Sequence, residues 1–243
     1  MRIAGFGAIT GAMLSGFIAQ EALTSRAGRE AVRERWVGAW CTMVLTLFGV
    51  RSIVQGTAPP RTRGHLIVAN HRSTADVLVL LRTFGGHMVS RADLARWPLV
   101  GAAARAVGTV FVDREDAVSG ATAVRAIRTR LAEGATIIVF PEGTTFSDDD
   151  VRPFHAGAFV AALRSGADIV PVGLAYAAKS GAAFVNETFP AHLARMAAAP
   201  PSQVALCIGA PISIDGSRAS LLRDRAHEEV QRLVNDARRL ADR

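Results

Sequence analysis

The sequence is poor in residues on which several classes of protein depend. Only two of its 243 residues are cysteines, Cys41 and Cys207, and both stand in apolar surroundings without metal-ligand spacing. This pattern predicts neither a disulfide framework nor a zinc site. Aromatic residues make up 6% of the chain and no basic run is interleaved with them, which argues against nucleic-acid binding. No Gly-x-Ser-x-Gly elbow is present, and this disfavours catalysis through a serine acyl-enzyme.

Lysine is almost absent, because Lys179 is the only one, yet the formal net charge is +7. Half of the residues are hydrophobic, and the mean hydropathy of +0.24 is high for a soluble protein. A basic and apolar chain suits an anionic membrane surface. We therefore expect a membrane lipid among its partners and no nucleic acid.

Two uncharged runs, residues 3–19 and residues 36–50, dominate the N-terminal part of the chain. Both are shorter than the roughly 20 apolar residues that a spanning helix needs. The link between them carries four arginines, and the positive-inside tendency argues against placing these opposite Arg51 and Arg63. We expect residues 1–56 to form a two-helix hairpin embedded in one leaflet, with its arginines on the cytoplasmic side. The alternative for the first run is a signal peptide, since Arg2 precedes it and small residues follow.

Residues 57–63, which include Pro59 and Pro60, read as a linker into a second region, residues 57–243. Short apolar runs there alternate with helical patterns, which predicts an α/β domain with a mixed sheet layered with helices. Strands are expected at residues 66–69, 88–90, 109–112, 169–174 and 204–208, with another ending at Phe140. The last stretch, residues 220–242, places apolar residues at helical spacing among many charges and predicts an amphipathic helix.

The turn after the first of these strands carries the most informative residues, Asn70-His71 followed by Asp76. Residues five apart in one helix point about 140° away from each other, so His71 and Asp76 can meet only if the histidine lies in the turn. Ser73 as N-cap would put Asp76 at N3, where it could hold one ring nitrogen of His71 and leave the other as a base. The alternative is a capping box, Ser73-x-x-Asp76, beside an ordinary turn histidine.

Three further blocks follow in order: Gly-Thr-Val-Phe-Val-Asp-Arg at residues 108–114, Phe-Pro-Glu-Gly-Thr-Thr at residues 140–145, and Ile-Val-Pro-Val at residues 169–172. Together with the Asn-His-x4-Asp turn, this ordered set resembles the glycerolipid acyltransferase family, whose bacterial type member acylates 1-acylglycerol-3-phosphate. The resemblance covers roughly residues 65–175.

The resemblance implies a membrane-bound enzyme that moves a fatty acyl group from acyl-CoA or acyl carrier protein to a lysophospholipid. It implies His71 as general base, Asp76 as the residue that orients it, no metal and no further cofactor. The first-choice acceptor is 1-acyl-sn-glycerol-3-phosphate, giving phosphatidic acid, and the expected place is the cytoplasmic face of the inner membrane. The substrate-binding residues that it implies are Asn70, Arg72, Arg114, Glu142, Gly143, Thr144 and Thr145.

Several of these residues have a plainer interpretation. Arg114 could be a surface arginine paired with Asp113 or Glu115, and the turn after Glu142 could simply be capped by Thr144. His155 stands where relatives often carry a lysine, and a lone histidine at a helix start is more often structural.

Thr145 is a departure from the family pattern, since many members carry an arginine there as a second phosphate contact. Losing that contact would weaken phosphate recognition, unless Arg114, Arg152 or Arg72 compensates. Members that acylate a lyso-ornithine lipid also read Glu-Gly-Thr-Thr, so that lipid or another lysolipid is the alternative acceptor. A third hypothesis is a non-catalytic lipid-binding membrane protein, which would have no need of the intact pair His71 and Asp76.

Overall fold

The structure is a computed structural model that describes residues 1–60, 62–113, 116–177, 180–185, 187–214, 216 and 218–242. Its strands are β1 (Val50–Gln55), β2 (His65–Ala69), β3 (His87–Arg91), β4 (Val110–Val112), β5 (Ile137–Val139), β6 (Asp168–Tyr176) and β7 (Ser202–Ile208). Its helices are α1 (Arg2–Leu23), α2 (Arg29–Phe48), α3 (Thr74–Phe84), α4 (Val100–Ala106), α5 (Ala117–Ala132), α6 (Gly157–Ser165), α7 (Phe189–Ala198) and α8 (Ala219–Ala241), with short 3-10 turns η1 (Arg26–Gly28) and η2 (Ala92–Arg96).

Within the described residues the strands form one seven-stranded sheet in the order β1-β7-β6-β2-β5-β3-β4. Neighbouring strands run parallel except β6 and β7, which are antiparallel, so the sheet is mixed as the sequence predicts. The central strand β2 lies between β5 and β6 and is buried along its whole length. Because β2 and β5 are parallel, their carboxyl ends meet at one edge of the sheet, where open α/β sheets bind ligands.

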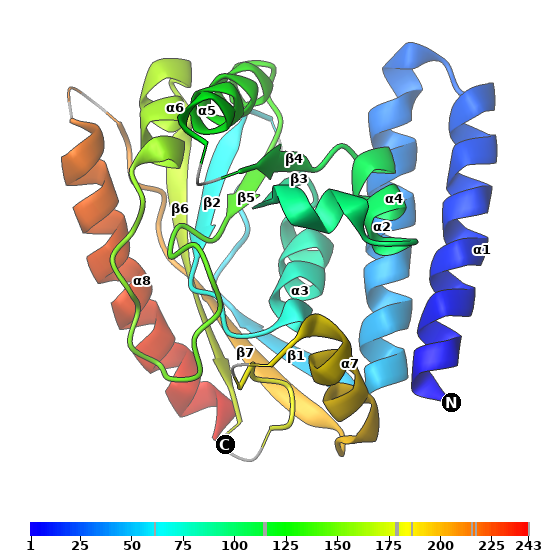
Figure 1. Cartoon of the computed structure of the whole chain (residues 1–243). Coiled ribbons are helices and arrows are strands. Elements are labelled where there is room, and N and C mark those ends of the chain that lie inside the picture. Colours follow the sequence, from blue (N-terminus) through cyan, green and yellow to red (C-terminus); the bar gives the residue numbers. More distant parts are fainter. Residues whose placement is uncertain are drawn as a thin grey trace.

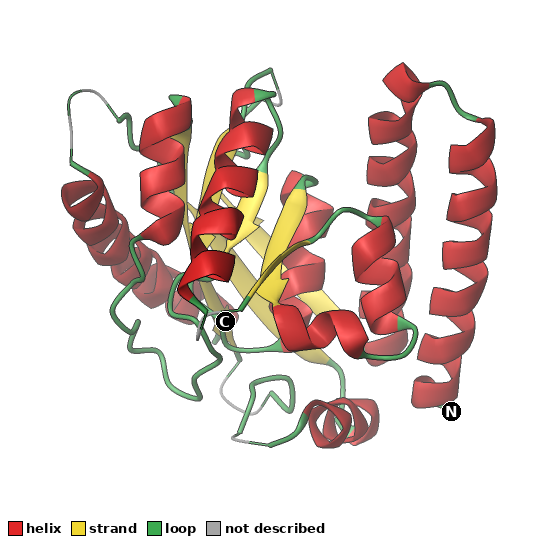
Figure 2. Cartoon of the chain, turned by 45° about the horizontal axis from the view of Figure 1, so that its top comes forward, coloured by secondary structure: helices red, strands yellow, loops and turns green. Residues whose placement is uncertain are grey.

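Helices cover both faces of the sheet (Figures 1 and 2). Ile67 of β2 packs with the buried residues of α2 and α3, whereas its neighbours Leu66 and Val68 pack with those of α5, α6 and α8. This is the alternation that a strand imposes, and burial on both faces explains why β2 reads as an unbroken apolar run.

Helix α8 lies so close to β6 that the contact requires a glycine. A Cβ atom at Gly173 would stand 2.2 Å from the carbonyl carbon of Leu233 and 2.3 Å from the backbone nitrogen of Val234. The amphipathic helix expected at the C-terminal end is therefore packed directly on the sheet, with Leu222, Val230 and Val234 buried.

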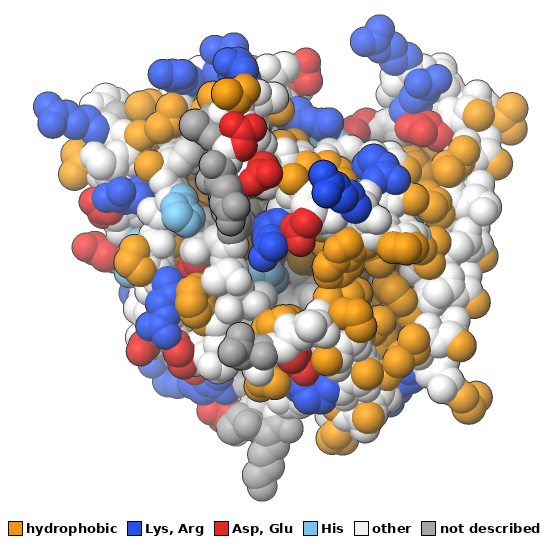
Figure 3. All heavy atoms as spheres, viewed as in Figure 1, with side chains coloured by type: hydrophobic (Ala, Val, Ile, Leu, Met, Phe, Trp, Pro, Cys, Tyr) orange, Lys and Arg blue, Asp and Glu red, His pale blue; other side chains and the backbone are white. Residues whose placement is uncertain are grey.

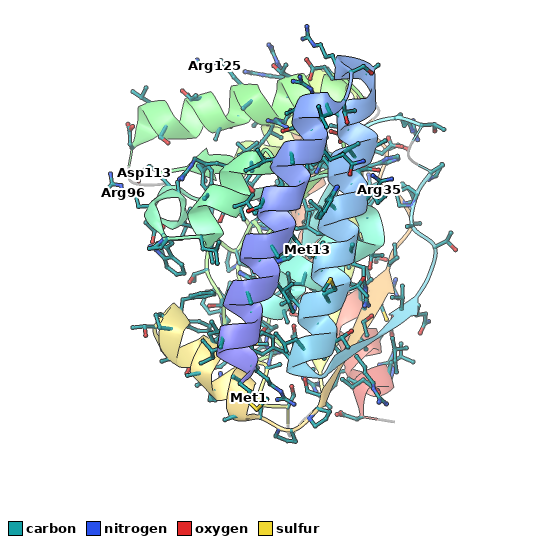
Figure 4. All side chains as sticks on the ribbon, turned by 90° about the vertical axis from the view of Figure 1, so that its right-hand side faces the viewer. Met1, Met13, Arg35, Arg96, Asp113 and Arg125 are labelled. Carbon is teal, nitrogen blue, oxygen red and sulfur yellow. The ribbon has the colours of Figure 1, made fainter. Side chains whose placement is uncertain are left out.

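The N-terminal part forms two paired helices, with α1 beside α2 (Figures 1 and 4). The indole nitrogens of α2 bind α1, since Trp40 donates to the Thr10 hydroxyl at 3.1 Å and Trp36 to the Gln20 amide oxygen at 2.6 Å. Helix α2 also contributes Val37, Cys41, Val44, Leu45 and Phe48 to the core against α3. The second helix is thus a core helix as well as half of a hairpin.

Helix α1 is the outer helix, and only 11% of its most apolar window is buried. Among the described helices it alone is long and apolar enough to cross a membrane. Large apolar side chains left exposed over this part of the chain are Met1, Ile3, Ile18, Leu23, Met43, Ile53 and Val54. Figure 3 shows hydrophobic side chains gathered over the half of the molecule that holds α1.

The sequence missed two elements. Residues 50–55, assigned above to the membrane-associated hairpin, form the edge strand β1, which pairs in parallel with β7. The sheet therefore begins before the boundary expected at residue 56. Helix α7 was also missed, although Thr188 caps it by accepting a hydrogen bond from the Ala191 backbone and Pro190 stands in its first turn.

Candidate active site

The turn that joins β2 to α3 holds the expected histidine and aspartate together. The His71 Nδ1 atom lies 2.9 Å from the Asp76 Oδ2 atom. Ser73 is the N-cap residue of α3, with its hydroxyl accepting from the Ala75 backbone at 3.1 Å, and Asp76 accepts from the Ser73 backbone at 2.7 Å. The capping box and the His–Asp pair are therefore both present, because one carboxylate oxygen serves both.

The Asp76 carboxylate is buried, with 0% of its surface exposed, and its contact with Nδ1 fixes the tautomer of His71. Since a carboxylate only accepts hydrogen bonds, the proton of the neutral ring lies on Nδ1 and leaves Nε2 with its lone pair. The described residues supply no hydrogen-bond partner for Nε2. The ring stacks on Phe140 with centroids 3.9 Å apart and planes within 7°, and 18% of the side chain is exposed. This arrangement presents a ring nitrogen that can act as a base whenever the imidazole is neutral.

Glu142 joins the turn after β5 to the turn that carries His71. Its Oε1 atom accepts from the His71 backbone N–H at 2.8 Å, and its Oε2 atom accepts from the Arg152 backbone N–H at 2.9 Å. Only 7% of the residue is exposed, and burial raises the pKa of its carboxyl above the usual value although these two donors oppose the rise. Glu142 does not line the cavity described below, and its two backbone donors indicate that it holds the two turns together. Its contact with substrate stays a prediction.

The next three residues lie at the cavity, and their contact with substrate stays a prediction. Gly143, Thr144 and Thr145 line the same cavity as His71. Gly143 has φ of +92°, a backbone conformation that side chains disfavour, and so it lets the turn reverse direction directly after the buried Glu142.

Two other predicted substrate contacts are turned away from this cavity. The Asn70 side chain is buried, donates to the Leu174 carbonyl at 3.0 Å and accepts from the Leu174 backbone N–H at 2.8 Å, which fastens the turn to β6. Arg72 is also buried, where it forms an ion pair with Asp149 and donates to the Ser147 carbonyl. Both side chains hold the turn through partners far along the chain, which the sequence could not show, and their contact with substrate stays a prediction.

The two other arginines considered above as phosphate contacts are Arg114 and Arg152. Arg114 lies outside the described residues. Arg152 forms an ion pair with Asp148 at 2.6 Å, and its guanidinium stands 5.0 Å above the Phe146 ring. It does not line the cavity. His155 is exposed just before α6 and is likewise absent from the cavity wall.

A partly buried ion network ties the turn to the C-terminal helix. Arg238 of α8 donates to both carboxylate oxygens of Asp149, at 2.6 and 2.9 Å, and Asp149 also pairs with Arg72. These guanidinium groups hold the pKa of Asp149 below its usual value although burial opposes them. A further donation from Arg238 to the Tyr176 carbonyl joins α8 to β6 at the same point.

Tyr176 is a functional candidate that sequence reasoning missed. Its hydroxyl donates to the Asp76 Oδ1 atom at 2.6 Å, on the side of the carboxylate that His71 leaves free. The residue lies two positions after Leu174 on β6, at the end of the strand that contains the Val-Pro-Val block. Its one sequence signal is that it is the only tyrosine in the chain.

A cavity of about 550 Å³ opens between the helical hairpin and the α/β domain, with His71 in its wall. Its lining is mostly apolar and comes from both halves of the protein. Residues that contribute to it include Phe6, Leu14 and Phe17 of α1, Trp36 and Trp40 of α2, Leu78 and Leu81 of α3, Val100 and Ala103 of α4, and Leu193 and Met196 of α7. Its volume falls in the range of small-molecule sites. A long apolar chain can be accommodated there with one end at the imidazole.

Comparison with known proteins agrees with this geometry. A family model described as Acyltransferase matches residues 51–175. The chain is 31% identical over 202 residues to a lyso-ornithine lipid O-acyltransferase of Pseudomonas aeruginosa, covering 79% of this chain and 76% of that protein. It is 29% identical to a 1-acyl-sn-glycerol-3-phosphate acyltransferase of Neisseria meningitidis, over 57% of this chain and about half (54%) of that protein.

The fold is similar to the crystal structure of the 1-acyl-sn-glycerophosphate acyltransferase PlsC from Thermotoga maritima. The TM-score is 0.72 at 22% identity, and the match covers 97% of both chains. The family model matches half of the chain, and the Pseudomonas relative is matched over most of its length. These two findings favour an enzyme over the hypothesis of a non-catalytic lipid-binding protein. The chain belongs to the acyltransferase family and is an acyltransferase of the lysophospholipid type.

Proposed function

We propose that the protein transfers a fatty acyl group from the thioester of acyl-CoA or acyl carrier protein to the hydroxyl of a lysolipid, with His71 as general base. One observation carries the proposal, namely that an imidazole held by a buried carboxylate stands in the wall of an apolar cavity. A thioester is already activated, so a base that removes the proton of the acceptor hydroxyl is sufficient.

In this mechanism the Nε2 atom of His71 takes the hydroxyl proton while the acceptor oxygen attacks the thioester carbonyl carbon. The tetrahedral intermediate then collapses, the carbon–sulfur bond breaks, and the imidazolium returns the proton to the leaving thiolate. Asp76 stays ionised and stabilises the imidazolium through Nδ1. General-base catalysis of this kind contributes roughly 10²–10⁴-fold.

The acyl chain would occupy the apolar cavity beside His71. Each buried methylene contributes about 0.8 kcal/mol, so a chain placed against these walls binds mainly through its length. The thioester end would then lie next to Gly143, Thr144 and Thr145, which share the wall with His71.

For the acceptor we propose a lyso-ornithine lipid, whose headgroup carries no phosphate. Ionisable residues in the described wall are His71, Arg91, Asp93 and Glu187. Arg91 is paired with Asp93, Glu187 is paired with Arg195, and Thr145 supplies no charge. Arg72 and Arg152, which could have replaced the missing arginine, are committed to Asp149 and Asp148. The described wall therefore has no unpaired cationic side chain for a phosphate dianion. The Pseudomonas aeruginosa relative, which matches over more of this chain than the Neisseria relative, is named a lyso-ornithine lipid O-acyltransferase.

A second candidate acceptor is 1-acyl-sn-glycerol-3-phosphate, named by the Neisseria relative and by the Thermotoga structure. This was the first choice from sequence. Binding of its phosphate would rely on Arg114, as the family resemblance implies.

We also propose that the protein works on the cytoplasmic face of the inner membrane. The support is the exposed apolar side of α1, together with Ile18, Leu23 and Met43 on the hairpin surface. Helix α1 is also tied at its start, because Arg2 donates to the Ala199 carbonyl behind α7 at 2.8 Å. An apolar outer helix fixed to the cavity wall would place the active site at the lipid surface.

The test is a transfer assay with purified protein in lipid nanodiscs, using labelled acyl-CoA or acyl carrier protein and a panel of lysolipids. We expect transfer to lyso-ornithine lipid, and a loss of at least about 10²-fold in His71→Ala. His155→Ala is the matched control, since it removes an exposed histidine and should retain full activity. Activity retained in His71→Ala would refute the role of His71, and a preference for the phosphate acceptor would refute the choice of acceptor.

A further inference from the structure

The Asp76 carboxylate is unusual in how completely the protein surrounds it. Its Oδ2 atom accepts from the Arg72 backbone at 2.6 Å, from the Ser73 backbone at 2.7 Å and from His71 Nδ1. All three donors belong to the turn that precedes α3. The other oxygen, Oδ1, has one protein donor among the described residues, the Tyr176 hydroxyl, and it comes from the sheet.

Tyr176 is rigidly placed for this contact. It is 2% exposed and stands in register with Val204 of the neighbouring antiparallel strand β7. Its carbonyl accepts from Arg238 of α8, so the strand is held on its far side as well. Burial, together with the charge of Asp76, raises the pKa of the phenol well above its usual range. The phenol therefore stays protonated and can act only as a donor to the carboxylate.

Hydrogen bonds to an ionised carboxylate favour the charged form, and each one withdraws charge from the oxygens. An aspartate that gives part of its charge to Tyr176 is a weaker acceptor for His71 Nδ1, which lowers the proton affinity of the ring. Other ionisable groups near this carboxylate act on it from several elements. They are His71 and Arg72 from the turn after β2, Glu142 from the turn after β5, and His192 from α7.

We propose that Tyr176 is a positioning residue that holds Asp76 and sets the proton affinity of His71 through it. The proposal rests on the proposed function, because it takes His71 as the base. It gives the end of β6 a role in tuning the reaction, in addition to its place in the core.

The first test is the pH dependence of kcat/KM for Tyr176→Phe, which removes only the hydroxyl. Without its donor, Oδ1 carries more charge, so His71 binds its proton more tightly and Asp76 is itself easier to protonate. Both effects move the acid limb of the profile to higher pH, by about one unit for the loss of one hydrogen bond to an ionised group. Thr83→Val is the matched control. It removes a hydroxyl from α3, the helix that carries Asp76, and this hydroxyl donates to the Val79 carbonyl and does not contact the His71–Asp76 pair.

A second test preserves the side chain. Tyr176 is the only tyrosine, so biosynthetic incorporation of fluorotyrosine changes this one residue. A fluorinated phenol is more acidic and a stronger donor, so the acid limb should move to lower pH, opposite to the shift in Tyr176→Phe. This version also decides the matter if Tyr176→Phe fails to fold.

The outcomes separate the two proposals. Opposite shifts in the two proteins support the role of Tyr176. An acid limb that stays at the wild-type pH in both, with activity merely scaled up or down, would show that the hydroxyl serves only the fold. Activity that survives in His71→Ala would instead refute the base itself, whatever the tyrosine variants do.

Discussion

Glu142→Gln distinguishes a residue that binds substrate from one that holds the site together. The carboxylate has an acceptor for each of two backbone N–H groups, those of His71 and Arg152. Glutamine has the same shape but only one acceptor oxygen, so its NH₂ group must face one of these donors. A buried donor left without an acceptor costs about 1–3 kcal/mol. Burial disfavours the charged form of Glu142 and so raises its pKa, which means that a neutral glutamine avoids part of this desolvation cost and offsets part of the loss. We expect a net loss of about 1–2 kcal/mol.

The measurement is thermal unfolding of the purified full chain, followed by tryptophan fluorescence, alongside steady-state kinetics. For a chain of this size, a loss of about 1–2 kcal/mol lowers Tm by roughly 2–8 °C. We also expect kcat to fall while KM for both substrates stays unchanged, because the displaced His71 backbone misplaces the base and no substrate contact is lost. Glu133→Gln is the control, since this glutamate is exposed after α5 and the same chemical change should have no effect there.

The reasoning would be refuted by the reverse pattern. If the Glu142 side chain binds the acceptor, as the family resemblance implies, Glu142→Gln should raise KM for the acceptor and leave Tm at the wild-type value.

Three further changes probe the acceptor, the packing and the response to acid. Thr145→Arg should raise kcat/KM for 1-acyl-sn-glycerol-3-phosphate about tenfold, since a charge-assisted contact is worth about 1.5–3 kcal/mol, and unchanged kinetics would show that this position does not meet the headgroup. Gly173→Ala should lower the free energy of unfolding by about 1–3 kcal/mol, because the added Cβ atom would clash with the backbone of α8. Gly120→Ala is the control, since this glycine lies within α5 with no atom near its Cβ position, and it should raise the free energy of unfolding by up to about 1 kcal/mol. Equal effects of the two substitutions in denaturant titrations would contradict the close packing. Burial, together with Arg33 and Arg130, lowers the pKa of His87 from 6.5 to about 4, so the unfolded chain binds a proton at a pH where the folded chain does not. The free energy of unfolding should therefore decrease by about 3 kcal/mol as the pH is lowered from 6.5 to 4. His87→Gln should lose this part of the pH dependence, and an equal decrease in the wild type and the variant would contradict the reasoning.

The parts of the site that the sequence predicted correctly depend on local geometry. Ser73 three residues before Asp76 is an N-cap pattern, and it also brings the carboxylate back over His71. The buried strands were visible because both faces of β2 and β5 are covered, which leaves no polar residue among residues 66–69 or in Ile137–Val139.

The parts that the sequence misassigned depend on partners far along the chain. Arg72 and Asn70 look like substrate contacts because they flank the base, but Asp149 and the Leu174 backbone engage them across 77 and 104 residues. Strand β1 escaped recognition because it is an edge strand, exposed along most of its length, and so carries no alternation of apolar and polar residues. No local pattern encodes such pairings.

Because α2 contributes to both the core and the cavity wall, the N-terminal helices and the catalytic centre cannot be separated. A shortened chain that begins at the linker would lose Val44, Leu45 and Phe48 from beneath the sheet, so solubilising the enzyme by truncation should unfold it. The same sharing puts Phe6 and Phe17 of α1 in one cavity wall with the imidazole, so any change in how the two N-terminal helices pack also changes the shape of the active site.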